Sequence, residues 1–272
     1  MFYWIRIYRG ALKAAIASML QYRFAILIWA VWGFVGPLIS LAVWSSVSSS
    51  SGASITGSSG AQFSRSDFAA YFLTFMVFGH LTMSWDAFEF AFRVRDGNLS
   101  PRLLKPIHPI HADIAANLAF KFVTTMMILP AWILLVVLLH PSPPQNFGTL
   151  LLAIPALIIA GMLRYMWQYS LALIAFWTTR VEAINQLFFS VDSFMSGRIA
   201  PIALMPGWLG AVAYYSPFRG MGSFPVELAL GRVQPADILP GFALQFVWLA
   251  AGIILFRILW ASGIKQYSAV GA

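Results

Sequence analysis

Residues Arg93 to Pro109 read RVRDGNLSPRLLKPIHP and separate two long apolar segments. The stretch combines basic side chains with Gly97, Pro101 and Pro106, whereas the segments on either side are almost free of charge. Glycine and proline interrupt regular helices, so the stretch predicts a short connection between two apolar helices. We expect this connection to transmit a conformational change rather than to carry catalytic chemistry.

The composition indicates an integral membrane protein. The chain has 272 residues, of which 60% are hydrophobic and only 10% are charged. A helix needs about 20 consecutive apolar residues to cross the roughly 30 Å hydrocarbon core of a bilayer, and several runs reach that length. A soluble protein would instead show shorter apolar helices with amphipathic partners. We therefore expect an all-α integral membrane fold in a single transmembrane domain, residues 1–272.

Six membrane spans can be drawn, and an even number places both termini on the same side. The spans are Phe24 to Trp44, Phe68 to Phe90, Phe122 to His140, Leu150 to Trp177, Ala183 to Ile199 and Ile238 to Trp260. Lys and Arg in short connections stay in the cytoplasm, and most basic residues lie on the side of the N-terminus. We expect a multi-pass protein of the cell (inner or plasma) membrane with both termini cytoplasmic. The net charge of +8 then faces membrane lipids and needs no nucleic acid.

The N-terminal segment 1–22 predicts an interfacial helix. Arg6, Arg9 and Lys13 follow the spacing of one helix face, while apolar residues lie mostly elsewhere around the helix. Such a helix lies along the inner leaflet with its apolar side in the lipid. The alternative is a basic tail that only sets the orientation of the first span.

The chain lacks the residues for several kinds of chemistry. It has no cysteine, which excludes disulfides and thiolate sites. No lysine follows a glycine, so a phosphate-binding P-loop ending in Gly-Lys-Ser/Thr is absent. His108 and His111 are too few ligands for a metal site. We expect no catalytic, cofactor or metal site, and any ATP-driven step would need an ATPase on another polypeptide.

The connection between the second and third spans resembles a family signature. Gly97-Asn-Leu99-Ser-Pro-Arg-Leu103-Leu104-Lys105-Pro106 is similar to the Gly-x-Leu-x-x-x-Leu-Leu-basic-Pro pattern of ABC-2 type transporter permeases, in particular the small six-span subfamily often encoded as paired permeases. Ser196-Gly197 followed by Pro201 and Met205-Pro206 agrees with it, as does the C-terminal stretch from Gly263 to Gly271.

The resemblance implies a coupling helix within the segment 93–109. In that family this connection docks into a cleft of the ATPase. The residues expected to serve docking are Gly97, Leu99, Arg102, Leu103, Leu104, Lys105 and Pro106. We expect the three leucines to form an apolar ridge, Arg102 and Lys105 to pair with acidic residues of the ATPase, and Pro106 to end the helix. The alternative is an ordinary basic cytoplasmic loop with a turn.

The resemblance also implies a function. The chain would be a non-catalytic permease subunit of an ATP-driven exporter that moves an amphipathic small molecule, a drug-like compound or a lipid-type substrate out of the cytoplasm. Its partners would be two ATPase subunits, which bind ATP and Mg, and a second permease, identical or homologous. The competing class is a secondary transporter or channel that works without an ATPase, which should show repeated halves and acidic residues at mid-membrane.

Segment 200–237 is rich in glycine and proline before the sixth span. So much interrupted backbone cannot face lipid, because each unpaired backbone group there costs several kcal/mol. We expect two short re-entrant helices that cap the outer side of the pathway, as in ABC-2 exporters. A plain extracellular loop is the alternative.

Two sets of charged residues near or within the spans are candidate functional groups. Arg164 and Asp192 stand at similar distances on either side of the turn near Thr178, so we expect them to meet at one depth in neighbouring helices. A structural staple is the first interpretation of this pair, and a substrate site is the second. Asp86, Glu89, Arg93 and Arg95 predict a charge network at the inner end of the second span, either static or acting as a gate.

Overall fold

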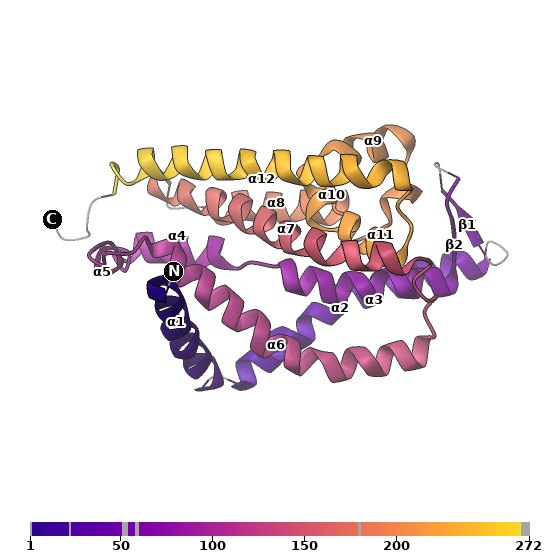
Figure 1. The fold of residues 1–272 in the computed structure, drawn as a ribbon, viewed down its shortest axis with the longest axis horizontal. Helices are drawn as coiled ribbons and strands as arrows, with labels where there is room; N and C mark the ends of the chain where they lie inside the picture. The colour runs from indigo at the N-terminus through magenta and orange to yellow at the C-terminus, as the bar shows by residue number, and fades with distance from the viewer. Residues whose placement is uncertain (1, 22, 51–53, 58–59, 179–180, 268–272) are drawn as a thin grey trace.

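The computed structural model describes residues 2–21, 23–50, 54–57, 60–178 and 181–267. The described chain is almost entirely helical, with one short β-hairpin, and the molecule is elongated (Figure 1). The hairpin lies at one end, called here the hairpin end, and the short helix α5 (Ser100–Leu103) lies at the other, called the α5 end. Helix α1 (Phe2–Gln21) also lies at the α5 end, at a steep angle to the long axis.

The first long helix leads from the α5 end to the hairpin. Helix α2 (Arg23–Ser50) is followed by strands β1 (Ser54–Thr56) and β2 (Gln62–Ser64), which pair antiparallel with Ile55 opposite Phe63. Ser64 then caps helix α3 (Arg65–Thr82) through a capping box with Asp67, which satisfies backbone N–H groups that the first helical turn leaves free.

The continuous helix expected over 68–90 is wrong, because the chain is interrupted after Thr82. Met83 has an extended backbone (φ −60°, ψ 146°), and helix α4 (Asp86–Arg95) starts anew. The side chain of Ser84 explains the restart: its hydroxyl donates to Asp86 Oδ2 at 2.9 Å and accepts from the Asp86 N–H at 3.4 Å. Such local bonds compete with the helical ladder.

Helix α6 (Pro109–Leu139) starts well before the expected boundary at Phe122. Pro109 occupies the first turn, where its missing N–H costs nothing, and the His108 side chain accepts from the Ile110 N–H at 3.2 Å. Burial, followed by the nearby charge of His111, lowers the pKa of His108, which favours the neutral imidazole that can accept this bond.

The second half of the chain contains two long helices and a group of short ones. Helices α7 (Phe147–Ala172) and α12 (Pro235–Gly263) pack against each other along the long axis (Figure 1). The elements between them are the 3₁₀ helix η1 (Leu173–Phe176), α8 (Glu182–Met195), the 3₁₀ helix η2 (Ile202–Leu204), α9 (Gly207–Tyr215), α10 (Pro217–Met221) and α11 (Ser223–Leu230). Helices α9, α10 and α11 lie at the hairpin end (Figure 1).

Helix α11 is the most deeply buried of these short helices. It packs against α3 and α7, and every residue from Ser223 to Leu230 except Glu227 is buried. Gly241 of α12 lies so close to Phe224 that a Cβ at this position would overlap the phenyl ring. The segment 200–237 is therefore a set of short helices, with α11 inside the protein, rather than an extended loop.

Three helices in the described part of the chain are long and apolar enough to cross a membrane by length and composition. They are Pro109–Leu139, Phe147–Phe176 and Pro235–Gly263. Their most apolar stretches are mostly not buried inside the protein, which is expected of helices whose apolar sides face lipid.

Candidate functional site

The predicted docking segment lies at the α5 end, but its three leucines do not form one ridge. Leu99 is completely buried and Leu103 is half-buried against the same apolar cluster, whereas Leu104 is 88% exposed. Gly97 explains the direction of the chain, because its φ of +72° turns Leu99 back under helix α4. The expected ridge is thus reduced to Leu104, followed by the exposed Lys105 and Pro106. The short helix also ends at Leu103, before Pro106.

Arg102 pairs with an acidic residue of its own chain. Its Nη1 lies 2.6 Å from Asp113 Oδ1, and Arg93 Nη1 lies 2.9 Å from the same oxygen. The second carboxylate oxygen of Asp113 accepts from the Tyr169 hydroxyl at 3.0 Å. Asp113 is only 2% exposed, so these contacts form in a low-dielectric setting, where hydrogen bonds to charges are strongest. One buried carboxylate thus ties α5 to helices α4, α6 and α7.

Sequence reasoning did not identify Asp113. Because α6 begins at Pro109, Asp113 stands one turn inside a helix, where it reaches Arg93 of α4 and Tyr169 of α7, instead of in a loop before the span. The available signal was its position four residues after a helix-starting proline, the spacing of one turn.

The C-terminal segment also contacts α5. The Tyr267 hydroxyl lies 2.8 Å from the Ser100 hydroxyl and donates to the Gly97 carbonyl at 3.4 Å. Tyr267 and Ile264 join the apolar cluster that contains Leu99. The remainder of the C-terminal stretch, 268–271, lies outside the described residues.

The four charged residues predicted near the inner end of the second span do not form one network. Arg93 belongs to the Asp113 cluster, while Arg95 lies 3.5 Å from Glu182 and 3.7 Å from Asp96 on the exposed surface. Asp86 is bonded to Ser84, and Asp86 and Glu89 occupy the first turn of α4, where the helix dipole favours acidic residues.

Asp86 and Glu89 line a cavity of about 600 Å³ at the α5 end, between helices α1, α4 and α6. Trp85, Phe88 and Phe120 contribute aromatic surface to it, and Met19 of α1 contributes a thioether. Arg93, Arg102 and Asp113 also reach this cavity, which we call the α5-end cavity.

Arg164 and Asp192 meet inside the protein. Arg164 Nη1 lies 2.7 Å from Asp192 Oδ2, and Arg164 Nη2 donates to the Met221 carbonyl at 3.4 Å. Arg198 lies 3.7 Å from the same oxygen of Asp192. The pair links α7, α8 and the short helices of the hairpin end.

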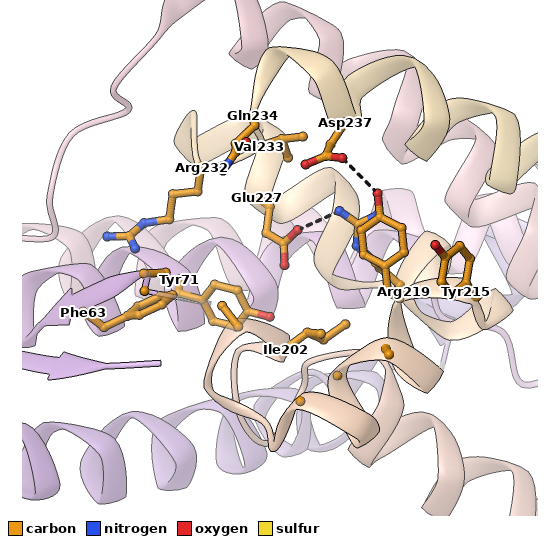
Figure 2. A pocket seen from close by; sticks show the side chains of 17 residues that line it. Phe63, Tyr71, Ile202, Tyr215, Arg219, Glu227, Arg232, Val233, Gln234 and Asp237 are labelled. Atoms are coloured by element: carbon orange, nitrogen blue, oxygen red, sulfur yellow. Dashed lines mark hydrogen bonds and ion pairs between the residues drawn. The ribbon is translucent and has the colours of Figure 1, made fainter. Parts of the chain in front are cut away.

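A second cavity, of about 810 Å³, opens at the hairpin end between the β-hairpin, the short helices and the start of α12 (Figure 2). Arg219 points toward Glu227, whose Oε2 lies 3.3 Å from its Nη2, and stacks on Tyr214 with 4.1 Å between the guanidinium carbon and the ring centroid. The Tyr214 hydroxyl in turn donates to Asp237 Oδ1 at 3.3 Å.

The guanidinium group of Arg232 closes another side of this cavity (Figure 2). It lies 2.7 Å from Asp67 Oδ1 and stacks on Phe63 with 4.3 Å to the ring centroid. These contacts join segments that are far apart in the sequence, so the pattern of residues gave no sign of the cavity.

Comparison with known proteins shows the family to which the chain belongs. No curated protein gives a significant match. Residues 55–271, from β1 to the C-terminal segment, match the model of a family described as ABC-2 family transporter protein, which confirms the resemblance suggested by residues 97–106. The chain belongs to the ABC-2 transporter family.

Proposed function

We propose that this chain is the permease subunit of an ATP-driven exporter, and that its α5 end docks onto a separate ATPase. Membership of the ABC-2 family supports a permease of an ABC transporter. The observation that carries the docking role is the contrast between Leu104, which is 88% exposed, and Asp113, which is 2% exposed and bonded to Arg102. An exposed apolar tip is thereby attached to the interior by a buried ion pair.

The bonds of Asp113 give a route for movement. A displacement of Leu104 would be transmitted to α6 by the Arg102–Asp113 ion pair. From Asp113 it would pass to α4 by Arg93 and to α7 by the Tyr169 hydroxyl. ATP binding would close two ATPase subunits together and move this end of the permease, which switches a pathway between inward-facing and outward-facing states.

The arrangement of the long helices supports six membrane passes with both ends in the cytoplasm. In chain order α2, α3 with α4, α6, α7, α8 and α12 lead alternately between the α5 end and the hairpin end (Figure 1). The α5 end carries Arg93, Arg95, Arg102 and Lys105, as expected for a cytoplasmic face. A second permease, identical or homologous, would complete the pathway, and amphipathic small molecules or lipids would be its substrates.

The decisive experiment uses Leu104→Asp, with Leu104→Met as its matched control. Leu104 makes almost no internal contact, so neither change should disturb folding. The chain is purified in mild detergent, its co-purifying proteins are identified by mass spectrometry, and ATP hydrolysis of the complex is measured. We expect an associated P-loop ATPase with the original chain and with Leu104→Met, and loss of association or of stimulated hydrolysis with Leu104→Asp.

Three outcomes separate the possibilities. If the ATPase stays bound to the Leu104→Asp variant and its ATP hydrolysis is still stimulated, docking through α5 is contradicted. A chain that transports in purified form without any ATPase is a secondary transporter or channel instead. A second permease in equal amount with the first establishes a heterodimeric pathway.

A further inference from the structure

We propose that the α5-end cavity binds an amphipathic organic cation, whose charge is held by Asp86 and Glu89. This inference depends on the proposed function only in making the cation the transported substrate. The cavity itself, its apolar walls and its carboxylates belong to the permease alone.

The size and lining of the cavity suit an aromatic ligand. Its volume of about 600 Å³ lies in the range of small-molecule sites, which are mostly apolar with a few placed polar groups. Trp85 and Phe88 of the α4 region stand on one side, and Phe120 of α6 and Met19 of α1 complete the apolar surface. Aromatic faces attract cations, and this attraction grows when the site is shielded from water.

The lining of the cavity carries one negative charge in excess, because three carboxylates, those of Asp86, Glu89 and Asp113, face two guanidinium groups, those of Arg93 and Arg102. Arg93 and Arg102 share the single carboxylate of Asp113, and Arg93 and Lys121 act on Asp86 through their charges without forming an ion pair with it. Within the part of the chain that the structure describes, neither Asp86 nor Glu89 forms an ion pair within 4.0 Å. Asp86 is 9% exposed and accepts a hydrogen bond from the Ser84 hydroxyl. A buried carboxylate without a cation is costly, so a bound cation would relieve that cost.

A purely structural role accounts for these two acids less well. The start of a helix favours an acidic residue by roughly 0.3–1 kcal/mol, and Asp86 is bonded there to the Ser84 hydroxyl through both its side chain and its N–H. That role does not account for the aromatic cavity that surrounds the two acids. An anionic ligand would be repelled by the two carboxylates, and a neutral one would leave them without an ion pair.

The position of the cavity fits entry from the membrane. Helix α1 packs against α6 and carries the apolar Met19 wall. If α1 lies on the inner leaflet, the cavity opens where acyl chains meet head groups. Amphipathic cations accumulate at this depth, because the inner surface is negatively charged.

Tetraphenylphosphonium and tetraphenylborate test the proposal, because they have almost the same size and shape but opposite charge. The full chain is reconstituted in nanodiscs of zwitterionic lipid, without ATPase, and binding is measured by equilibrium dialysis. We expect saturable binding of tetraphenylphosphonium, and about tenfold or greater weakening by Glu89→Gln and by Asp86→Asn, which corresponds to at least about 1.4 kcal/mol. Tetraphenylborate should bind no better than to empty nanodiscs.

Two further variants guard against trivial effects. Ala116→Trp fills the cavity from α6 without altering its charge and should abolish binding. Glu182→Gln removes an exposed acid from the same end, where it faces Arg95, and should leave binding unchanged. Thermal unfolding of each variant identifies any loss of folding. Glu89→Gln should disturb folding least, because Glu89 lies at the surface.

Binding of tetraphenylphosphonium that survives Glu89→Gln, Asp86→Asn and Ala116→Trp overturns the proposal. Equal binding of tetraphenylborate overturns it as well, because the site would then select shape rather than charge. Since no ATPase is present, a positive result stands even if the exporter function fails. A positive result combined with ATP-dependent uptake of the cation into inverted vesicles would identify the cation as substrate.

Discussion

Arg164 Nη1 lies 2.7 Å from Asp192 Oδ2, and the side chains of both residues are 1% exposed. Neither charge can reach water, so each depends on the other, with Arg198 as a weaker third member at 3.7 Å. Removing one partner of such a pair leaves a buried charge, whereas removing both leaves Arg198 as the remaining charge, and its side chain is 29% exposed.

Asp192→Asn should therefore destabilise the protein by about 3–5 kcal/mol, measured as thermal unfolding in detergent. The double variant Arg164→Met with Asp192→Leu should recover most of this loss. If the pair is a structural staple, the double variant also retains transport. Single variants with the stability of the original chain would contradict the buried pairing.

Asp113→Asn should weaken the connection between α5 and the long helices. The substitution leaves Arg93 and Arg102 facing each other without the carboxylate that both bind. We expect a loss of about 2 kcal/mol in stability, since bonds to charged groups contribute roughly that amount, and at least a tenfold drop in substrate-stimulated ATP hydrolysis. Tyr169→Phe, which removes only the bond at 3.0 Å, is the milder control. Unchanged stimulation in Asp113→Asn would contradict the proposed route.

Stability should fall in acid through Asp67. Burial acts to raise the pKa of Asp67, but the bonds from Ser64 and the Arg232 guanidinium outweigh it, so the pKa lies below its ordinary value. A carboxylate with a lowered folded pKa stabilises above its unfolded pKa of about 4, and this contribution is lost as pH falls through the folded value.

Thermal unfolding between pH 7 and pH 3 measures this effect. Asp67→Asn should be less stable than the original chain at pH 7, and the difference should shrink toward pH 3. A constant difference across that range would show that the ion pair with Arg232 does not cause it.

Gly241→Ala should loosen the hairpin end. A Cβ at this position would overlap the ring of Phe224, and such overpacking costs about 1–3 kcal/mol. Gly161→Ala in α7 is the matched control, because a Cβ there meets no atom within 4 Å, so it should be neutral or stabilising. Adding Phe224→Leu to Gly241→Ala should restore part of the stability. Equal unfolding temperatures for the two alanine variants would argue against the close contact.

The sequence predicted features that depend on one helix or on two helices joined by a short turn. Arg164 and Asp192 lie at similar distances along the sequence from the turn near Thr178, which predicted that they share one depth, and the structure places them in contact. The apolar runs predicted a helical membrane protein, and the pattern at residues 97–106 pointed to the family that the chain matches.

Features that depend on which way a side chain faces in the folded protein, or on which distant segments meet, were not predicted. Leu99 and Leu104 look alike in sequence, but the turn at Gly97 buries one and exposes the other. Asp113 can bind Arg93, Arg102 and Tyr169 because α6 begins at Pro109 and places it inside a helix. The ion pair of Arg232 with Asp67 joins two segments far apart in the sequence, which no local pattern connects. The break after Thr82 has no glycine or proline to announce it, and the bonds of Ser84 with Asp86 form only where the next helix starts.

The burial of α11 has a consequence for the order of biosynthesis. Helix α11 fills the space between α3 and α7, yet it is made after both of them. Until α11 has left the ribosome, the parts of α3 and α7 that it covers remain available to lipid or to a chaperone. A nascent chain halted before Ser223 should thus be held by the insertion machinery, while one that extends through α12 can be released.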